Sequence, residues 1–406
     1  MRLCILHNSG PGGAARLVNQ IALGLAATDD VTVCTWGDTP VSTPPGVCAM
    51  WCRPPRIHLP APFHPFANLV RSYLGSLGAA KRVDAGAFDV ALVLACQWGQ
   101  APQALRRLRT PHIYFAQEGR RRTTESNYLP VASSARADHM IRSMGRLIYD
   151  GLGARLDRQA MRSASTIVAN SAFTAHRLAQ AYGVSAQVIE LGVAVDQFRP
   201  GGHRSDKPGA LVVGALDPTK GHELAVESLA RLPMINRPTL RIVFNRGDES
   251  FGAHLTRLAQ ARGVKLNLLR NVSEAELVAE YQAATFLLAL AQDEPFGLTV
   301  LEASACGTPT VAVGEGGYLR TVDPSLNGIL APRDPDAVAR AVSEILTGLR
   351  AFDSQLMAAW TGEHWGWGRC ISRLRAALVT ESERGTDDGP EGRNPNPARA
   401  EASWTN

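Results

Sequence analysis

Two glutamates eight positions apart, Glu294 and Glu302, bracket a Pro-Phe-Gly turn and a short apolar stretch. The amides of Phe296, Gly297 and Leu298 are predicted to lie at the start of a helix. Unpaired amides and the helix dipole both favour an anion there, so a phosphate group is the expected ligand. Glycine at position 297 is expected to let that ligand approach the backbone. The stretch therefore predicts a binding site rather than ordinary packing.

The surrounding elements place these residues at the edge of a parallel sheet. A continuous apolar run from Phe286 to Leu290 is typical of a strand that is buried on both faces. Ligands of open α/β sheets bind at the carboxyl ends of such strands. Glu294 lies just after the carboxyl end of this predicted strand. Gly307 and Pro309 then end the predicted helix, because glycine just past a helix and proline beyond it prevent its continuation.

The run from Asp293 to Pro309 resembles the Glu-x7-Glu motif of the retaining family 4 glycosyltransferases, the glycosyltransferase group 1 type with the GT-B fold. Six other segments resemble signatures of this family and follow in its order. They are Gly12–Arg16, Ala169–Ser171, Gly192–Pro200, Val213–Gly221, Val272–Leu277 and Gly316–Gly317. The resemblance covers roughly residues 1–380. It implies an α/β architecture of two Rossmann-like domains, each a doubly wound parallel sheet, that face each other across a cleft.

The resemblance also implies the transfer of a sugar from a nucleotide-diphosphate sugar to a hydroxyl group. Glu294 would orient the transferred sugar, and Glu302 would accept hydrogen bonds from the ribose hydroxyl groups. Lys220 and the helix amides would stabilise the charge on the departing diphosphate. No metal or other cofactor is expected, because protein side chains supply the positive charge and the sequence shows no Asp-x-Asp motif of metal-dependent transferases.

Three positions depart from the family pattern. Ala215 stands where the family usually has an arginine that contacts the diphosphate, and loss of one such charge-assisted hydrogen bond costs about 1.5–3 kcal/mol. Gln117 stands where many relatives have a histidine, so this side chain forms hydrogen bonds but carries no charge. Arg320 stands where the family has an acid, and either it or Arg246 is a candidate for the cation missing at position 215. These departures leave a second hypothesis open, a catalytically impaired relative that binds nucleotide or glycan as a scaffold or partner subunit.

The first domain is expected to supply the acceptor side of the site. Gly12 and Gly13 lie in the loop after the first predicted strand, where their amides can approach a phosphate or the acceptor. Gln117, Glu118 and Arg120 follow another predicted strand and are the candidate acceptor-side residues. The acceptor implied by the resemblance is a glycan, a lipid-linked glycan or a small molecule, in cell-surface polysaccharide or glycoconjugate biosynthesis.

Charge is shared unevenly along the chain. Residues 1–200 hold 21 Lys and Arg against 12 Asp and Glu, whereas residues 201–406 hold 21 against 25. The basic half predicts an anionic partner such as a phosphorylated acceptor or lipid headgroups, with a solvated basic face as the alternative. The predicted helix 66–82 is the candidate membrane contact, although a core-facing amphipathic helix is the simpler interpretation. Nucleic acid is not expected, because no DNA- or RNA-binding motif accompanies the charge.

Alternating strand-like and helix-like runs divide the chain into two domains. The expected strands are residues 3–7, 31–36, 90–95, 112–116 and 166–169, then 210–213, 240–244, 266–269, 285–290 and 310–313. The N-terminal acceptor-side domain is expected over residues 1–200, with its Pro-rich interval 39–65 as a surface excursion. A polar Gly/Pro stretch then begins the nucleotide-sugar domain at 201–360.

The two C-terminal segments are expected to differ in structure. Residues 361–380 are predicted to form a helix that returns to the N-terminal domain. Residues 381–406 contain almost nothing apolar, so they are predicted to form a disordered tail that cannot offset its ordering entropy.

Several features predict a cytoplasmic protein. No run of 18 or more apolar residues is present, and the apolar start of the chain is too short for a signal peptide. The seven cysteines are scattered and odd in number, which favours a reducing compartment. Peripheral contact with the inner face of an anionic membrane is a further expectation, from the basic N-terminal half.

Overall fold

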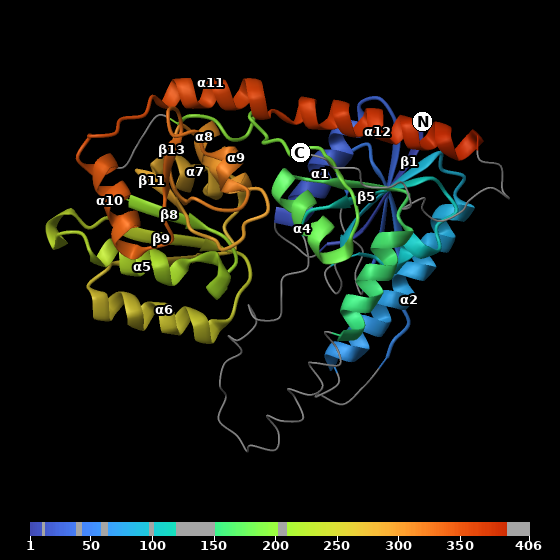
Figure 1. Cartoon of the computed structure of the whole chain (residues 1–406), viewed down its shortest axis with the longest axis horizontal. Coiled ribbons are helices and arrows are strands. Elements are labelled where there is room, and N and C mark those ends of the chain that lie inside the picture. Colours follow the sequence, from blue (N-terminus) through green and yellow to red (C-terminus); the bar gives the residue numbers. More distant parts are fainter. Residues whose placement is uncertain are drawn as a thin grey trace, which may run out of the picture. The chain divides into compact units, whose positions relative to one another are not determined.

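The computed structural model describes residues 1–9, 13–37, 43–57, 64–96, 101–118, 151–201 and 209–387. This part of the chain forms two compact units (Figure 1). Unit 1 holds the described residues up to Glu190 and those from Ile371 onward, and unit 2 holds Leu191–Cys370. The chain therefore enters unit 2 before the boundary expected at residue 200, and it returns to unit 1 within its last described helix.

Unit 1 is built on a parallel sheet of seven described strands. They are β1 (Arg2–Asn8), β2 (Asp30–Trp36), β3 (Cys48–Cys52), β4 (Val90–Cys96), β5 (His112–Ala116), β6 (Thr166–Ala169) and β7 (Gln187–Val188). Their spatial order is β3-β2-β1-β4-β5-β6-β7, so the direction of strand order reverses between β1 and β4. The central strands are almost wholly buried, because a parallel sheet carries helices on both faces.

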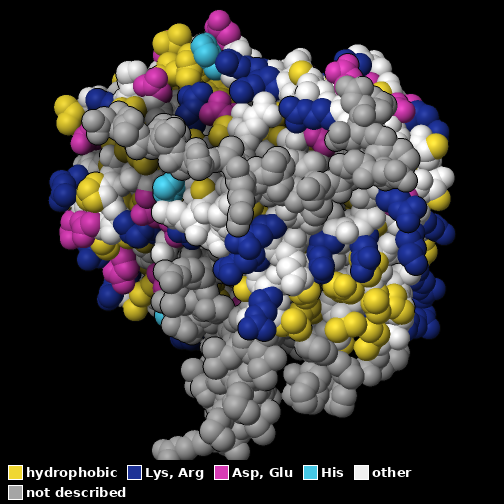
Figure 2. Space-filling view, turned by 45° about the vertical axis from the view of Figure 1, so that its right-hand side comes forward, with side chains coloured by type: hydrophobic (Ala, Val, Ile, Leu, Met, Phe, Trp, Pro, Cys, Tyr) yellow, Lys and Arg dark blue, Asp and Glu magenta, His cyan; other side chains and the backbone are white. Residues whose placement is uncertain are grey.

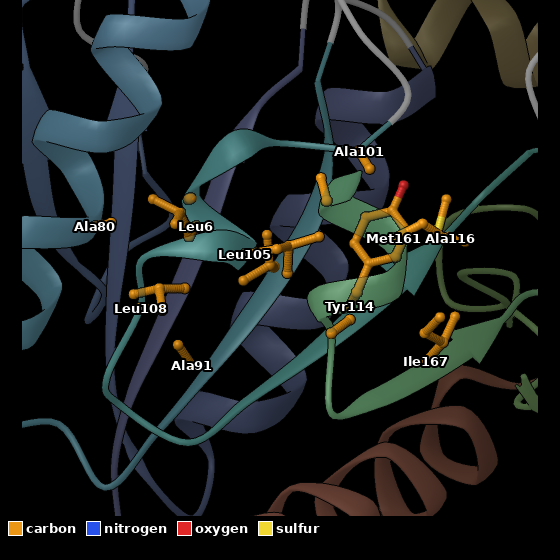
Figure 3. Close-up of a cluster of buried hydrophobic side chains, with 14 of the residues drawn as sticks. Leu6, Ala80, Ala91, Ala101, Leu105, Leu108, Tyr114, Ala116, Met161 and Ile167 are labelled. Carbon is orange, nitrogen blue, oxygen red and sulfur yellow. The ribbon is translucent and has the colours of Figure 1, made fainter. Parts of the chain in front are cut away.

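Helices pack on the sheet of unit 1 (Figure 1). They are α1 (Gly13–Ala26), α2 (His64–Ala85), a helix over residues 151–163, α4 (Ala172–Tyr182) and α12 (Trp367–Asp387), with the 3-10 turn η2 (Gln103–Arg106). One buried apolar cluster joins the sheet to α2, η2, α4 and the helix over residues 151–163, and it includes Leu6, Leu105, Tyr114, Met161 and Ile167 (Figure 3). Burial of this apolar surface holds the unit together.

Two expectations about unit 1 are wrong. The Pro-rich interval is not only a surface excursion, because β3 lies within it and pairs in parallel with β2. The disordered tail does not begin at residue 381, because α12 continues to Asp387. The Glu381 carboxylate is buried and accepts hydrogen bonds from Ser165 Oγ at 2.5 Å and Thr166 Oγ1 at 2.7 Å. Polar composition alone does not reveal such distant partners.

Unit 2 contains a second parallel sheet, of six described strands. They are β8 (Gly209–Val213), β9 (Thr239–Phe244), β10 (Leu266–Arg270), β11 (Phe286–Ala289), β12 (Thr310–Val313) and β13 (Gly328–Ala331). Their order is β10-β9-β8-β11-β12-β13, so the direction of strand order reverses between β8 and β11. The five strands predicted for this domain are present, and β13 at the edge was missed.

The described helices of unit 2 begin either at a side-chain N-cap or at a glycine without one. They are α5 (His222–Ala230), α6 (Glu249–Arg262), α7 (Glu274–Ala283), α8 (Leu298–Ala305), α9 (Tyr318–Thr321), α10 (Pro335–Leu346) and α11 (Ser354–Trp365), with the 3-10 turns η4 (Pro218–Lys220) and η5 (Met234–Asn236). Ser273 and Glu276 form a capping box at the start of α7, and the Asp334 side chain accepts two amides of α10. Within the described ranges, no helix of either unit is long and apolar enough to cross a membrane.

Candidate functional site

The candidate site of unit 2 lies at the carboxyl ends of β8 and β11, where the strand order reverses. Ligands of open α/β sheets bind at such a reversal point. Lys220 is the last residue of η4, which follows β8, and Glu294 follows β11. Lys220 Nζ and Glu294 Oε2 form an ion pair at 2.9 Å, with side chains 25% and 20% exposed. The structure thus brings together the two residues that the sequence predicted as catalytic, 74 positions apart.

The loop that carries Lys220 is closed by its own hydrogen bonds. Asp217 caps η4 by accepting from the Thr219 amide at 2.9 Å, and Gly221 follows in the left-handed conformation, with φ 75°. His222 Nε2 lies 2.8 Å from the Ala215 carbonyl and, in the matching tautomer, donates to it. Burial lowers the pKa of His222, despite the opposing effect of this hydrogen bond, so the ring is neutral at pH 7. A buried neutral histidine therefore holds the base of the loop.

The backbone of Glu294 packs directly against the Gly316–Gly317 pair. The Gly317 amide donates to the Glu294 carbonyl at 2.7 Å. Gly316 has φ 60°, and a Cβ added there would lie 2.6 Å from the same carbonyl oxygen. Only glycine allows this close approach. The Gly316–Gly317 signature therefore has a physical explanation, because these glycines let the chain approach the Glu294 backbone.

Helix α8 begins where the sequence predicted, with Gly297 as its N-cap at φ 93° and no side-chain cap. Within the described part of the chain, no acceptor is recorded for the amides of Gly297 and Leu298, as an anion site requires. The structure also gives a packing reason for glycine at position 297. A Cβ there would lie 2.7 Å from Thr321 Oγ1, so protein atoms rather than a ligand fill that side. Phe296 is buried and packs edge-on against Trp365 at 5.8 Å.

Glu302 is almost completely buried, at 2% exposure, in the middle of α8. Its Oε2 atom accepts a hydrogen bond from the Tyr281 hydroxyl of α7 at 2.7 Å. A buried carboxylate requires such partners, because an unpaired charge is costly in the interior. The Tyr281 ring in turn packs edge-on against Phe198 at 5.9 Å. Sequence reasoning did not detect Tyr281, since nothing local connects it with Glu302.

The two candidate replacements for the missing arginine lie in different surroundings. The Arg320 guanidinium lies over the Trp365 ring, 4.7 Å from its centroid. Arg246 is exposed, and its carbonyl accepts the Leu216 amide at 2.8 Å, which brings its backbone beside Ala215. The Lys220 side chain lies against neighbouring Gly214. Arg246 is therefore the candidate whose main chain adjoins the loop of Lys220.

The structure describes only some of the residues predicted for the site in unit 1, because Gly12 and Arg120 lie outside the described residues. Gly13 is the first residue of α1, and Gln117 and Glu118 follow β5. The Asn170 side-chain amide donates to the Gln117 carbonyl at 2.7 Å.

Sequence reasoning missed His7, a buried residue near the carboxyl end of β1. Burial lowers the pKa of His7 to about 4, so the ring is neutral. Its Nδ1 atom accepts the Ser9 amide at 3.1 Å. Beside it, the Asn8 side-chain amide lies 3.7 Å from Cys96 Sγ, so both residues mark the reversal point between β1 and β4. A histidine within an apolar run before a glycine-rich loop was the available sequence signal.

No group of three or more His, Cys, Asp or Glu in the described ranges is arranged to hold a metal ion. The groups that the structure brings together in unit 2 are an ammonium, a carboxylate, and the amides at the start of α8. These groups suit a ligand that carries both phosphate oxygens and sugar hydroxyl groups.

Two family models match the chain in succession. The one described as Glycosyltransferase Family 4 matches residues 11–197, and the one described as Glycosyl transferases group 1 matches residues 195–352. A D-inositol 3-phosphate glycosyltransferase from Geodermatophilus obscurus is 32% identical over 254 residues, which are 56% of this chain and 55% of the relative. Another from Streptosporangium roseum is 30% identical over 243 residues, covering 54% and 55%. The chain spans about half the length of the curated relatives it matches.

Solved structures of two proteins resemble nearly the whole chain. Sucrose-phosphate synthase from Thermosynechococcus elongatus has a TM-score of 0.72 at 19% identity, covering 94% of this chain and 99% of that one. Anabaena Alr3699/HepE, in complex with UDP and glucose, has a TM-score of 0.68 at 18% identity, covering 94% and 100%. At these identities the similarity establishes the fold.

Proposed function

The chain belongs to the glycosyltransferases of group 1 and family 4 and has the GT-B fold predicted from its sequence, and from this premise we propose a retaining, metal-independent sugar transfer from a nucleotide-diphosphate sugar to a hydroxyl group. The ion pair between Lys220 and Glu294 carries the proposal. The pair lies at the reversal point of a doubly wound sheet, where open α/β sheets generally bind their ligands, and this supports the proposal.

In the proposed reaction, Lys220 exchanges its carboxylate partner for phosphate oxygens when the sugar nucleotide binds. Glu294 is then available to accept hydrogen bonds from the sugar and to orient it. The acceptor hydroxyl attacks the anomeric carbon on the face from which the diphosphate leaves. A C–O bond to the acceptor forms, the C–O bond to phosphate breaks, and the acceptor proton passes to the departing diphosphate. Lys220 and the amides that begin α8 stabilise the charge on that leaving group.

The other residues of this proposal contribute to binding the sugar nucleotide. Glu302, held by Tyr281, presents its carboxylate toward the ribose, and Arg246 supplies the second cation beside Ala215. An ammonium and a guanidinium together match a diphosphate better than a single charge does.

The nature of the substrates is supported by the named relatives. Structures of HepE hold UDP, UDP-glucose, or UDP with glucose, which supports a UDP-sugar as the first candidate donor. The curated relatives are named for inositol 3-phosphate, which supports a phosphorylated small molecule alongside a glycan or lipid-linked acceptor. We place the enzyme in the cytoplasm, in cell-surface polysaccharide or glycoconjugate biosynthesis.

A peripheral membrane contact is part of the proposal for unit 1. Leu74 of α2 and Leu152 of the neighbouring helix are exposed apolar side chains, and Arg82 and Arg155 are exposed cations in the same two helices. Figure 2 shows Lys and Arg side chains gathered beside hydrophobic ones on one face. Co-sedimentation with anionic vesicles that falls steeply with salt supports this contact, and binding indifferent to salt contradicts it.

A release assay tests the enzymatic proposal. The full chain is incubated with a panel of UDP-, GDP- and ADP-sugars, and liberated nucleotide diphosphate is measured. Release is expected with at least one sugar nucleotide and is lost in Glu294→Gln and Lys220→Ala, while Arg340→Ala, an exposed change in α10, retains it. Tight nucleotide binding without turnover across the panel overturns the proposal and favours the impaired, nucleotide-binding relative.

A further inference from the structure

Arg333 lies in the loop after β13, two strands from β11 in the sheet, yet it reaches the segment that leads to Glu294. Its Nη1 and Nη2 atoms donate to the carbonyls of Leu290 and Ala291, each at 2.9 Å. Its Nε atom donates to Glu315 Oε1 at 3.0 Å, and Nη2 contacts the same oxygen. One planar guanidinium therefore binds two consecutive carbonyls and a carboxylate.

The rest of this segment is held by other loops. The Gln292 amide donates to the Thr219 carbonyl at 2.8 Å, which ties the segment to the loop of Lys220. The Asp293 amide points to Glu315 Oε1 at 3.4 Å, and the Glu294 carbonyl accepts from Gly317. Each residue from 290 to 294 thus has a backbone contact with Arg333 or with another loop of unit 2.

Such support has a physical reason. Strand β11 ends at Ala289, so the segment lies beyond the hydrogen-bond ladder of the sheet. Asp293 adopts a left-handed conformation with φ 49°, which costs a non-glycine residue on the order of 1–3 kcal/mol and persists only where its surroundings impose it. This conformation sets the direction in which the chain presents Glu294.

We propose that Arg333, oriented by Glu315, is a positioning residue that holds Glu294 in the direction needed to meet Lys220 and the sugar. Arg333 acts through the backbone of residues 290–294 and touches no reacting atom. The proposal rests on the proposed function, because it assigns the contact to the orienting role of Glu294. Arginine is required, because lysine has no planar fork that spans two carbonyls and a carboxylate.

The test compares Arg333→Ala, Arg333→Lys and the milder Glu315→Gln with Arg340→Ala as a matched control for the loss of a surface guanidinium. Thermal unfolding, UDP affinity, and kcat and KM for the sugar nucleotide are measured on the full chain. The Arg333 variants are expected to fold and bind UDP as the parent does while kcat falls by about 10²-fold, because a small misplacement of an orienting group is costly. Added guanidinium, below denaturing concentrations, restores part of the turnover of Arg333→Ala but none in Glu294→Gln.

A binding measurement separates this proposal from the enzymatic one. The affinity gained from the sugar is the affinity for UDP-glucose relative to UDP, and it is measured in Arg333→Ala, in Glu294→Gln and in the double variant. Both single changes are expected to reduce the gain, and the double variant to reduce it no further, since the two residues act as one unit. Additive losses overturn the positioning role, as does a parallel loss of UDP affinity and melting temperature. An absence of turnover in the parent protein defeats only the proposed reaction.

Discussion

Lys220 and Glu294 form an ion pair that is partly exposed, so it contributes little to stability. Pairs of this kind are worth about 0–1 kcal/mol, because water screens the charges and ordering two long side chains costs entropy. Its position at the carboxyl edge of the sheet, where open α/β sheets bind ligands, therefore fits the proposed chemistry better than a role in folding. We therefore expect that substitution of either residue changes turnover but leaves the stability of the fold nearly unchanged.

Lys220→Ala is expected to lower kcat by about 10²–10³-fold, because it removes a preorganised cation from the departing diphosphate. Its melting temperature is expected to stay close to that of the parent protein. Steady-state kinetics with the best sugar nucleotide and a thermal melt check both statements. Unchanged turnover contradicts the assigned role, and a large loss of melting temperature shows that the change acts on folding instead.

Arg246→Ala is expected to weaken UDP binding by about 1.5–3 kcal/mol while leaving uridine binding unchanged, because only the diphosphate meets the guanidinium. Ala215→Arg in that background is expected to restore affinity by supplying a cation from the adjoining loop. Calorimetry with UDP and with uridine provides the comparison. Equal losses for both ligands rule out a phosphate contact.

Helices α7 and α8 are joined by a buried hydrogen bond. Tyr281 donates to Glu302 at 2.7 Å, and both side chains are shielded from water. The bond orients the carboxylate predicted to hold the ribose, and it also ties two helices that flank the site. A local sequence pattern predicts each helix, but it contains no information about this pairing.

Tyr281→Phe is expected to lower the free energy of unfolding by about 1–3 kcal/mol, because a buried acceptor loses its donor. Urea denaturation measures the change. Tyr73→Phe, in α2 of unit 1, is the matched control and is expected to have a smaller effect, since Tyr73 is not fully buried. Equal effects contradict the importance of the buried pair.

The part of α12 from Ile371 onward completes unit 1, although it follows unit 2 in the chain. Arg375 Nε donates to Asp29 Oδ2 at 2.7 Å, and the N-terminal amine donates to Oδ1 at 3.0 Å. Burial raises the pKa of Asp29, but hydrogen bonds from Arg375, the amine and Thr28 outweigh it and lower the pKa to about 2. The C-terminal helix is thereby tied to the first strands through one ionised carboxylate.

This tie makes stability dependent on pH. Because the folded-state pKa of Asp29 lies below its ordinary value of 3.8, its contribution is present above about pH 4 and is lost as the pH falls toward 2. Asp29→Asn is expected to lower the urea midpoint at pH 7, with a difference that shrinks between pH 4 and pH 2. Asp30→Asn, an exposed neighbour, controls for loss of a charge. A difference independent of pH contradicts the assignment.

Much of the fold followed from local signals. Apolar runs predicted the central strands of both sheets, and Gly307 with Pro309 correctly marked the end of α8, because these signals depend on the chain's own conformation. Short edge strands such as β3 and β13 were missed, since a short apolar run does not distinguish a strand from a helix and the pairing depends on a neighbouring strand.

The sequence by itself determined the two series of strands, the family, and Lys220 and Glu294 as the residues to examine. Only the tertiary structure decided that these two side chains meet, that Tyr281 holds Glu302, that Arg333 supports the segment before Glu294, and that Glu381 is buried. Conformational preferences act over a few neighbouring residues, so a short stretch of sequence is enough to predict them. Hydrogen bonds and ion pairs between distant residues form only when packing brings their elements together, so no local sequence pattern predicts them.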